Sequence, residues 1–109
     1  MKPDSINVMG INFKITYCND TADVVPEKIK DKAYGYSFLE NHEIRIYDGA
    51  SLEFTWQSIL HEVFHMIGDM TRLSILNTHY NEQKHNEVDC FANVLTDVLF
   101  RNNLIRIDE

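Results

Sequence analysis

Several features that would assign a function class at once are missing from this sequence. It has no cluster of lysine and arginine residues, and its formal net charge of -7 argues against direct binding to nucleic acid or to an anionic membrane. No apolar run is long enough to span a bilayer, and the first residues lack the apolar core of a secretory signal. Internal repeats and low-complexity tracts are absent as well. We therefore expect a soluble, cytoplasmic protein.

Cysteine is also scarce, with only Cys18 and Cys90, and the two do not form a C-x-x-C motif. We interpret both as buried thiols in a reducing compartment and not as a disulfide. The chain has 109 residues, of which 44% are hydrophobic, enough for one core. We expect a single domain over residues 1–109.

The strands are predicted mainly in the first half of the chain. Apolar and polar residues alternate over 11–17, which is typical of a half-buried strand. Two β-prone runs, 34–39 and 43–47, are separated by a short polar break and predict a hairpin. A short closing strand is predicted at 104–107.

Two long helices follow the predicted hairpin. Ser51 is a favourable N-cap for a helix from about residue 52 to about residue 68. A second helix is predicted from about residue 84 to residue 101. This order of elements indicates an α+β fold, with a small antiparallel or mixed sheet packed on a pair of helices.

The first helix carries the pattern His61-Glu62-Val63-Phe64-His65. Histidines four residues apart on a helix project from the same face, close enough to hold one metal ion. Glu62 directly follows the first histidine, where it can accept a proton from a metal-bound water. The pattern predicts the core of a zinc hydrolase, with one Zn²⁺ per chain.

A catalytic zinc ion usually has three protein ligands, so one more is needed. Glu87 shares a face of the second helix with four apolar residues at helical spacing: Phe91, Val94, Leu95 and Val98. An unpaired carboxylate on such a core-facing stripe would be costly, and a metal ion removes that cost. We therefore predict Glu87 as the third ligand. Asp89 is predicted to face solvent and is rejected as a ligand.

Three stretches, taken in order, resemble the ImmA/IrrE family of small zinc metallopeptidases, which occur in phages, integrative elements and bacteria. They are the strand 43–47, the motif segment 59–65 and the segment 86–95, which is similar to the family's E-A-D-x-F-A segment. The resemblance covers about half of the chain. It implies a zincin-like pair of helices and a third metal ligand at the position of Glu87. The family often has glycine before the second histidine, where this chain has Phe64.

Other roles for the remaining polar residues stay open at this point. His79 or His85 would be the third ligand if the site resembles that of the SprT group. His85 is predicted on the outward face of its helix, which counts against it, whereas His79 lies in the connection between the helices. His79, His85 and Tyr80 are also candidates for an extra hydrogen-bond donor to the oxyanion of the transition state. The sequence does not choose between them.

The leading hypothesis is a zinc-dependent endopeptidase in which Glu62 transfers a proton from water to the leaving amine. The strand 43–47 is expected to pair with an extended protein or peptide substrate by β-augmentation. The resemblance implies that this substrate is a transcriptional repressor or another regulatory protein of a mobile element. The alternative hypothesis is a metallopeptidase-like module that binds a regulatory protein without cutting it.

Overall fold

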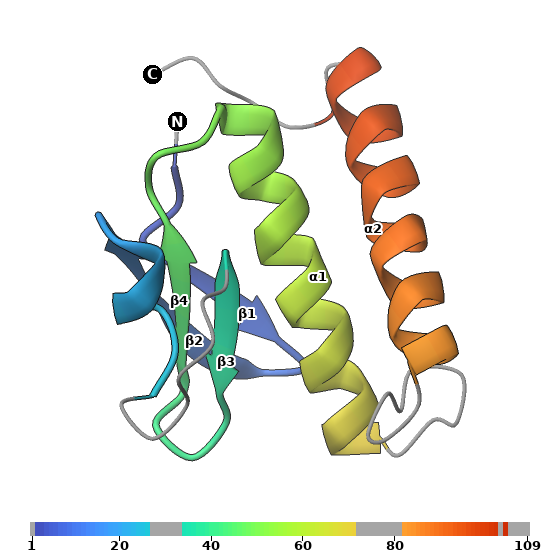
Figure 1. The fold of residues 1–109 in the computed structure, drawn as a ribbon. Coiled ribbons are helices and arrows are strands. Elements are labelled where there is room, and N and C mark those ends of the chain that lie inside the picture. Colours follow the sequence, from blue (N-terminus) through green and yellow to red (C-terminus); the bar gives the residue numbers. More distant parts are fainter. Residues whose placement is uncertain (1, 27–33, 72–81, 103, 105–109) are drawn as a thin grey trace.

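A computed structural model of the chain describes residues 2–26, 34–71, 82–102 and 104. It has a four-stranded mixed sheet and two long helices, which confirms the α+β class (Figure 1). The elements, in chain order, are β1 (Ser5–Val8), β2 (Ile11–Cys18), the 3-10 turn η1 (Thr21–Asp23), β3 (Gly35–Phe38), β4 (Glu43–Tyr47), α1 (Leu52–Thr71) and α2 (Glu82–Arg101).

The sheet has the strand order β1-β2-β4-β3. The predicted hairpin is confirmed, because β3 and β4 pair antiparallel, while β4 pairs parallel with β2 on its other side. Strand β1 was not predicted, and it pairs antiparallel with β2. Strand β4 therefore has a hydrogen-bonded neighbour on both sides, so the expectation that it pairs with an extended substrate is wrong. Among the described strands, β3 and β1 form the edges of the sheet.

Helix α1 covers one face of the sheet and contributes much of the core. The hydroxyl of Ser51 accepts a hydrogen bond from the backbone N–H of Phe54 at 3.2 Å, which confirms the predicted N-cap. The helix packs against β3 and β4, and its residues Ile59, Val63 and Met66 join the buried cluster of the sheet. It continues to Thr71, about one turn beyond the predicted end.

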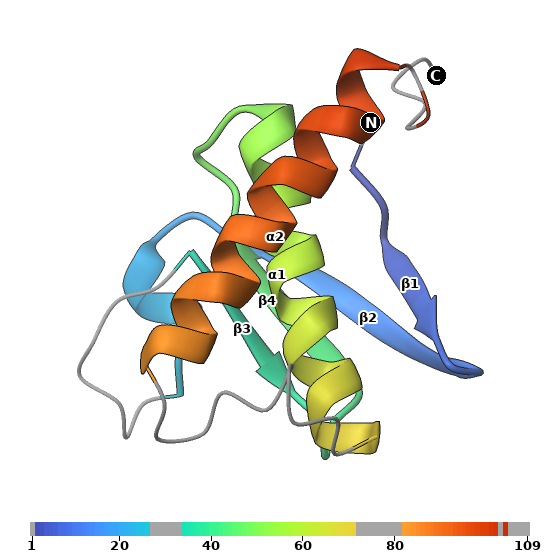
Figure 2. The same ribbon diagram turned by 90° about the vertical axis from the view of Figure 1, so that its right-hand side faces the viewer.

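Helix α2 lies beside α1 and runs in the opposite direction (Figures 1 and 2). It buries three small or medium-sized residues, Val88, Ala92 and Thr96. The hydroxyl of Thr96 donates to the carbonyl of Ala92 at 2.7 Å, so this buried polar group is satisfied within the helix. Small side chains on this face allow the two helices to approach closely.

The predicted core-facing stripe of α2 is wrong. Phe91, Val94 and Val98 are exposed, and Glu87 is exposed with them. The helix is turned so that its small residues, and not its largest apolar ones, face α1. His85 and Asp89, which were predicted to face outward, are exposed, and each also contacts His61 of α1.

Three smaller predictions have mixed outcomes. Both cysteines are free, but Cys18 is only half-buried and Cys90 is exposed, so the expectation of buried thiols is wrong. Of the predicted closing strand, Leu104 is exposed and outside any strand, and the other residues lie outside the described ranges. Neither of the two 20-residue helices has the apolar length that would let it cross a membrane, judged over the part of the chain that is described.

Candidate metal centre

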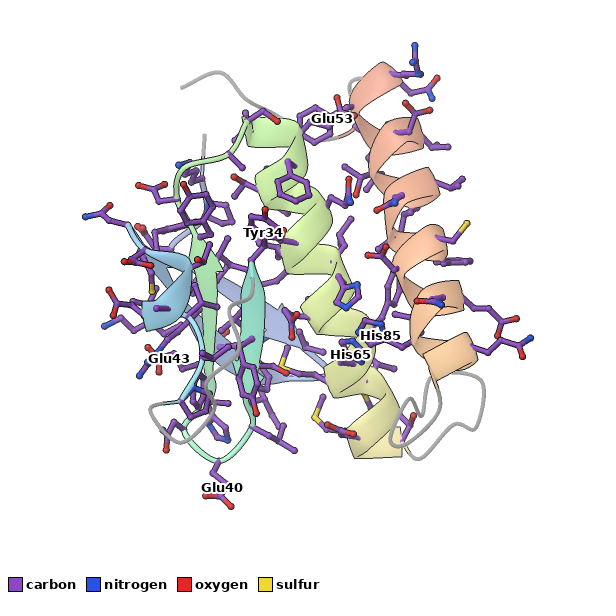
Figure 3. All side chains as sticks on the ribbon, viewed as in Figure 1. Tyr34, Glu40, Glu43, Glu53, His65 and His85 are labelled. Atoms are coloured by element: carbon purple, nitrogen blue, oxygen red, sulfur yellow. The ribbon has the colours of Figure 1, made fainter. Side chains whose placement is uncertain are left out.

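Three histidines from two helices meet at one place. His61 and His65 come from α1, and His85 comes from the first turn of α2. Each offers one nitrogen, and the three nitrogens lie within 4.8 Å of one another. In Figure 3 the labelled His65 and His85 lie next to each other between the helices, and their rings stack with centroids 5.1 Å apart.

The geometry of this histidine cluster fits a zinc ion with small adjustments. The Nε2 atoms of His61 and His65 are 2.8 Å apart. Two imidazole ligands at about 2.0–2.1 Å from a tetrahedral zinc ion would have nitrogens roughly 3.3 Å apart. Small rotations of the two side chains are enough to move their Nε2 atoms about half an ångström further apart. Burial lowers the pKa of His61, so its ring is more readily neutral, as metal ligation requires.

The carboxylate of Asp89, on α2, lies next to the Nδ1 atom of His61. The Nδ1 atom of His61 is buried and has no hydrogen bond of good geometry, and its closest acceptor is Oδ1 of Asp89 at 3.1 Å. A small rotation that turned this contact into a hydrogen bond would fix the orientation and the tautomer of His61 and leave its Nε2 atom for a metal. Asp89 follows His85 by four residues, so one face of α2 presents both side chains. As predicted, Asp89 is exposed and does not belong to the group of three nitrogens, but its carboxylate reaches His61.

Glu62 lies on the sheet side of α1, next to β3. Only 7% of its surface is exposed. Burial raises its pKa to about 7, although hydrogen bonds from the hydroxyl and the backbone N–H of Ser37 favour the ionised form and offset part of the shift. A carboxylate with a pKa near neutrality can both accept and donate a proton at physiological pH.

The histidines and Glu62 share one pocket of about 480 Å³. One wall is the beginning of β3 with Tyr34, another is α1, and His85 and Asp89 of α2 form the third. The aromatic side chains at one end, Tyr34 and Phe54, contact each other edge to face with ring centroids 5.2 Å apart. The pocket therefore combines a titratable carboxylate, a histidine cluster and an apolar wall.

The other predicted site residues are not part of this cluster. Glu87 is exposed, does not line the pocket and does not belong to the group of three nitrogens. His79 and Tyr80 lie outside the described residues. His85, which the sequence placed on the outward face, is exposed, and its ring lies beside those of His61 and His65. The spacing of His85 and Asp89, four residues apart on one helix, was the available signal for this pair.

Comparisons of the chain with models of protein families, with curated proteins and with solved structures gave no match. The resemblance to the ImmA/IrrE family therefore stays a prediction that rests on the three stretches quoted above.

Proposed function

We propose that this protein is a zinc-dependent endopeptidase with a zincin-like site in which His61, His65 and His85 hold the metal ion. The observation that carries the proposal is the convergence of these three histidines beside a buried glutamate in one pocket. His85 replaces Glu87 as the proposed third ligand, because its ring is within 5.1 Å of both other rings, centroid to centroid.

The histidines and Asp89 prepare the site for the ion. A zinc ion held by His61, His65 and His85 would lower the pKa of a water molecule and polarise the carbonyl of the peptide bond to be cleaved. Asp89 acts by orienting His61, whose second nitrogen it contacts at 3.1 Å.

Glu62 is the proposed general base and acid. It directly follows His61 on the helix and lines the same pocket. In its ionised form it accepts a proton from the attacking water, and in its protonated form it passes that proton to the leaving amine. Ser37 of β3 lies beside this carboxylate and favours its ionised form. Because Ser37 belongs to β3, a displacement of this edge strand would also change the surroundings of the proposed base.

The edge strand β3 is the proposed docking strand for an extended substrate. It lines the pocket and is paired on one side with β4, while no described strand occupies its other side. An extended peptide can add to such an edge through main-chain hydrogen bonds. The resemblance to the ImmA/IrrE family further supports a regulatory protein, such as a transcriptional repressor, as the natural substrate.

The test uses the zinc-loaded protein and a peptide library derived from a bacterial proteome, with new N-termini identified by mass spectrometry. We expect cleavage by the wild type and a loss of at least about 1,000-fold in Glu62→Gln, which keeps the shape of the side chain but cannot act as a base. Zinc content should be the same in both proteins. Equal zinc content without cleavage by either protein would favour the alternative, a module that binds a regulatory protein without cutting it.

A further inference from the structure

The side of α2 that faces away from the pocket carries an apolar stripe. It consists of Phe91, Val94 and Val98, which are 61%, 58% and 44% exposed, and which we call the α2 stripe. The spacing of three and four residues places them on one face of the helix. Within the described ranges, α1 is the element that lies beside α2 in both ribbon views, and the three side chains of the stripe remain exposed (Figures 1 and 2). Exposed apolar side chains in a contiguous row are typical of contact surfaces.

The stripe continues onto α1 and is separate from the proposed active site. The ring of Phe91 meets that of Phe64 of α1 edge to face, with centroids 5.2 Å apart, so the apolar surface spans both helices. Val94 follows His85 by nine residues, which at about 100° per residue places it roughly 180° around the helix. A partner bound to the stripe would therefore leave the pocket open.

A negative and a positive side chain lie at the two ends of the stripe, at equal distances from Val94 at its centre. Glu87 precedes Val94 by seven residues and Arg101 follows it by seven, which corresponds to about 10.5 Å in each direction along the helix. Together the five positions repeat at four and three residues, the spacing of a coiled-coil seam. Both charged residues are exposed.

We propose that the α2 stripe binds a second copy of this chain, with the two α2 helices antiparallel and the two-fold axis next to Val94. In this arrangement Val94 meets its own copy, Phe91 lies near Val98 of the partner subunit, and Glu87 pairs with Arg101 of the partner subunit. The surface is thus complementary to itself, as a two-fold interface requires. A parallel arrangement would instead bring like charges together at both ends.

Two opposing effects are small enough to allow this dimer. Arg101 already contacts Asp97 of its own helix at 2.7 Å, but a guanidinium group has further donors for a second carboxylate. Each chain has a formal net charge of -7, yet charges separated by more than about 8 Å are largely screened at physiological salt. The stripe consists of only three apolar side chains per subunit, whereas stable interfaces bury roughly 800 Å² per partner, so we expect a weak dimer with a Kd of about 10–100 µM.

Sedimentation equilibrium of the full chain between about 1 and 500 µM tests the proposal. We expect a reversible monomer–dimer equilibrium in the wild type and a monomer throughout in Val94→Asp. The matched control is Asn93→Asp, which adds the same charge at an exposed position about 100° away from Val94, and which should dimerise like the wild type. Circular dichroism of each variant verifies that the helices are intact. A wild type that is monomeric at all concentrations, or a dimer that survives Val94→Asp, overturns the proposal.

Charge reversal tests the antiparallel register. Glu87→Arg and Arg101→Glu should each weaken dimerisation by about 5-fold or more, because each creates two like-charge contacts per dimer. The double variant restores opposite charges and should recover most of the affinity. Failure of the double variant to recover affinity would contradict the antiparallel arrangement about Val94.

Discussion

Gly35 of β3 faces Glu62 of α1, and there is little room for a side chain between the strand and the carboxylate. A Cβ atom at residue 35 would lie 3.2 Å from both Cγ and Oε2 of Glu62 and 3.3 Å from Cδ1 of Ile46. Contacts this short force a neighbour to move by a few tenths of an ångström. The edge strand therefore limits the position of the proposed base, both through this close approach and through Ser37 beside the carboxylate.

Replacing Gly35 by alanine should displace the carboxylate of Glu62 while leaving the histidines in place. We expect peptidase activity to fall about 10-fold or more, because small misplacements of a catalytic group have large effects on rate. Zinc content should be unchanged, and the free energy of unfolding should change by no more than about 1–3 kcal/mol. Activity equal to that of the wild type would show that the position of Glu62 does not depend on this contact.

Asp89→Asn tests the support that this carboxylate gives to His61. We expect zinc affinity to fall by about 10- to 100-fold, as for other carboxylates that hydrogen-bond a metal-bound histidine. Competition with a chromophoric chelator measures this change. Asp97→Asn is the matched control, since Asp97 is on the same helix but pairs with Arg101. If both variants bind zinc as tightly as the wild type, Asp89 has no role in positioning His61.

The metal-free protein should become less stable as the pH rises through the titration of Glu62. The carboxyl has a pKa of about 7 in the folded chain and an ordinary pKa of 4.5 in the unfolded chain, so between these pH values the folded chain binds more protons than the unfolded chain. The stabilisation that results is complete below about pH 4.5 and is lost by about pH 7 or slightly above. This difference in pKa between the folded and the unfolded chain corresponds to about 3 kcal/mol in the free energy of unfolding.

Glu62→Gln isolates this effect, because the amide does not titrate. After treatment with a chelator, chemical denaturation measures the free energy of unfolding of both proteins. Between pH 4.5 and 8, this free energy should rise in the variant relative to the wild type by up to about 3 kcal/mol. Equal dependence on pH in the two proteins would mean that Glu62 is ionised in the folded state at a normal pKa.

The sequence predicts the elements with strong local signals. The hairpin of β3 and β4 follows from two β-prone runs, and the start of α1 follows from Ser51. Strand β1 was not predicted, because its four residues, Ser5–Val8, are too few for a clear alternation. The place of β4 inside the sheet was also not predicted, since its parallel pairing with β2 is a contact between distant segments.

The face of α2 was predicted incorrectly for a physical reason. Hydrophobic spacing selects Phe91, Val94 and Val98, yet close packing of two helices selects small side chains such as Ala92. Reliance on hydrophobicity alone assigned Glu87 to the core, whereas the structure exposes it. The histidine pair and Glu62 were easier to predict, because neighbouring turns of one helix fix their relative positions. The position of the proposed third ligand depends on how the two helices pack, which a local sequence pattern does not contain.

The most direct test of the account is the zinc content of His85→Ala and Glu87→Ala beside the wild type, each purified without a chelator or a histidine tag. We predict about one zinc ion per chain in the wild type and in Glu87→Ala, and little or none in His85→Ala. Zinc that is retained in His85→Ala but lost in Glu87→Ala would contradict the proposed ligand set. Absence of zinc from the wild type, even after zinc is added, would contradict the metal centre itself.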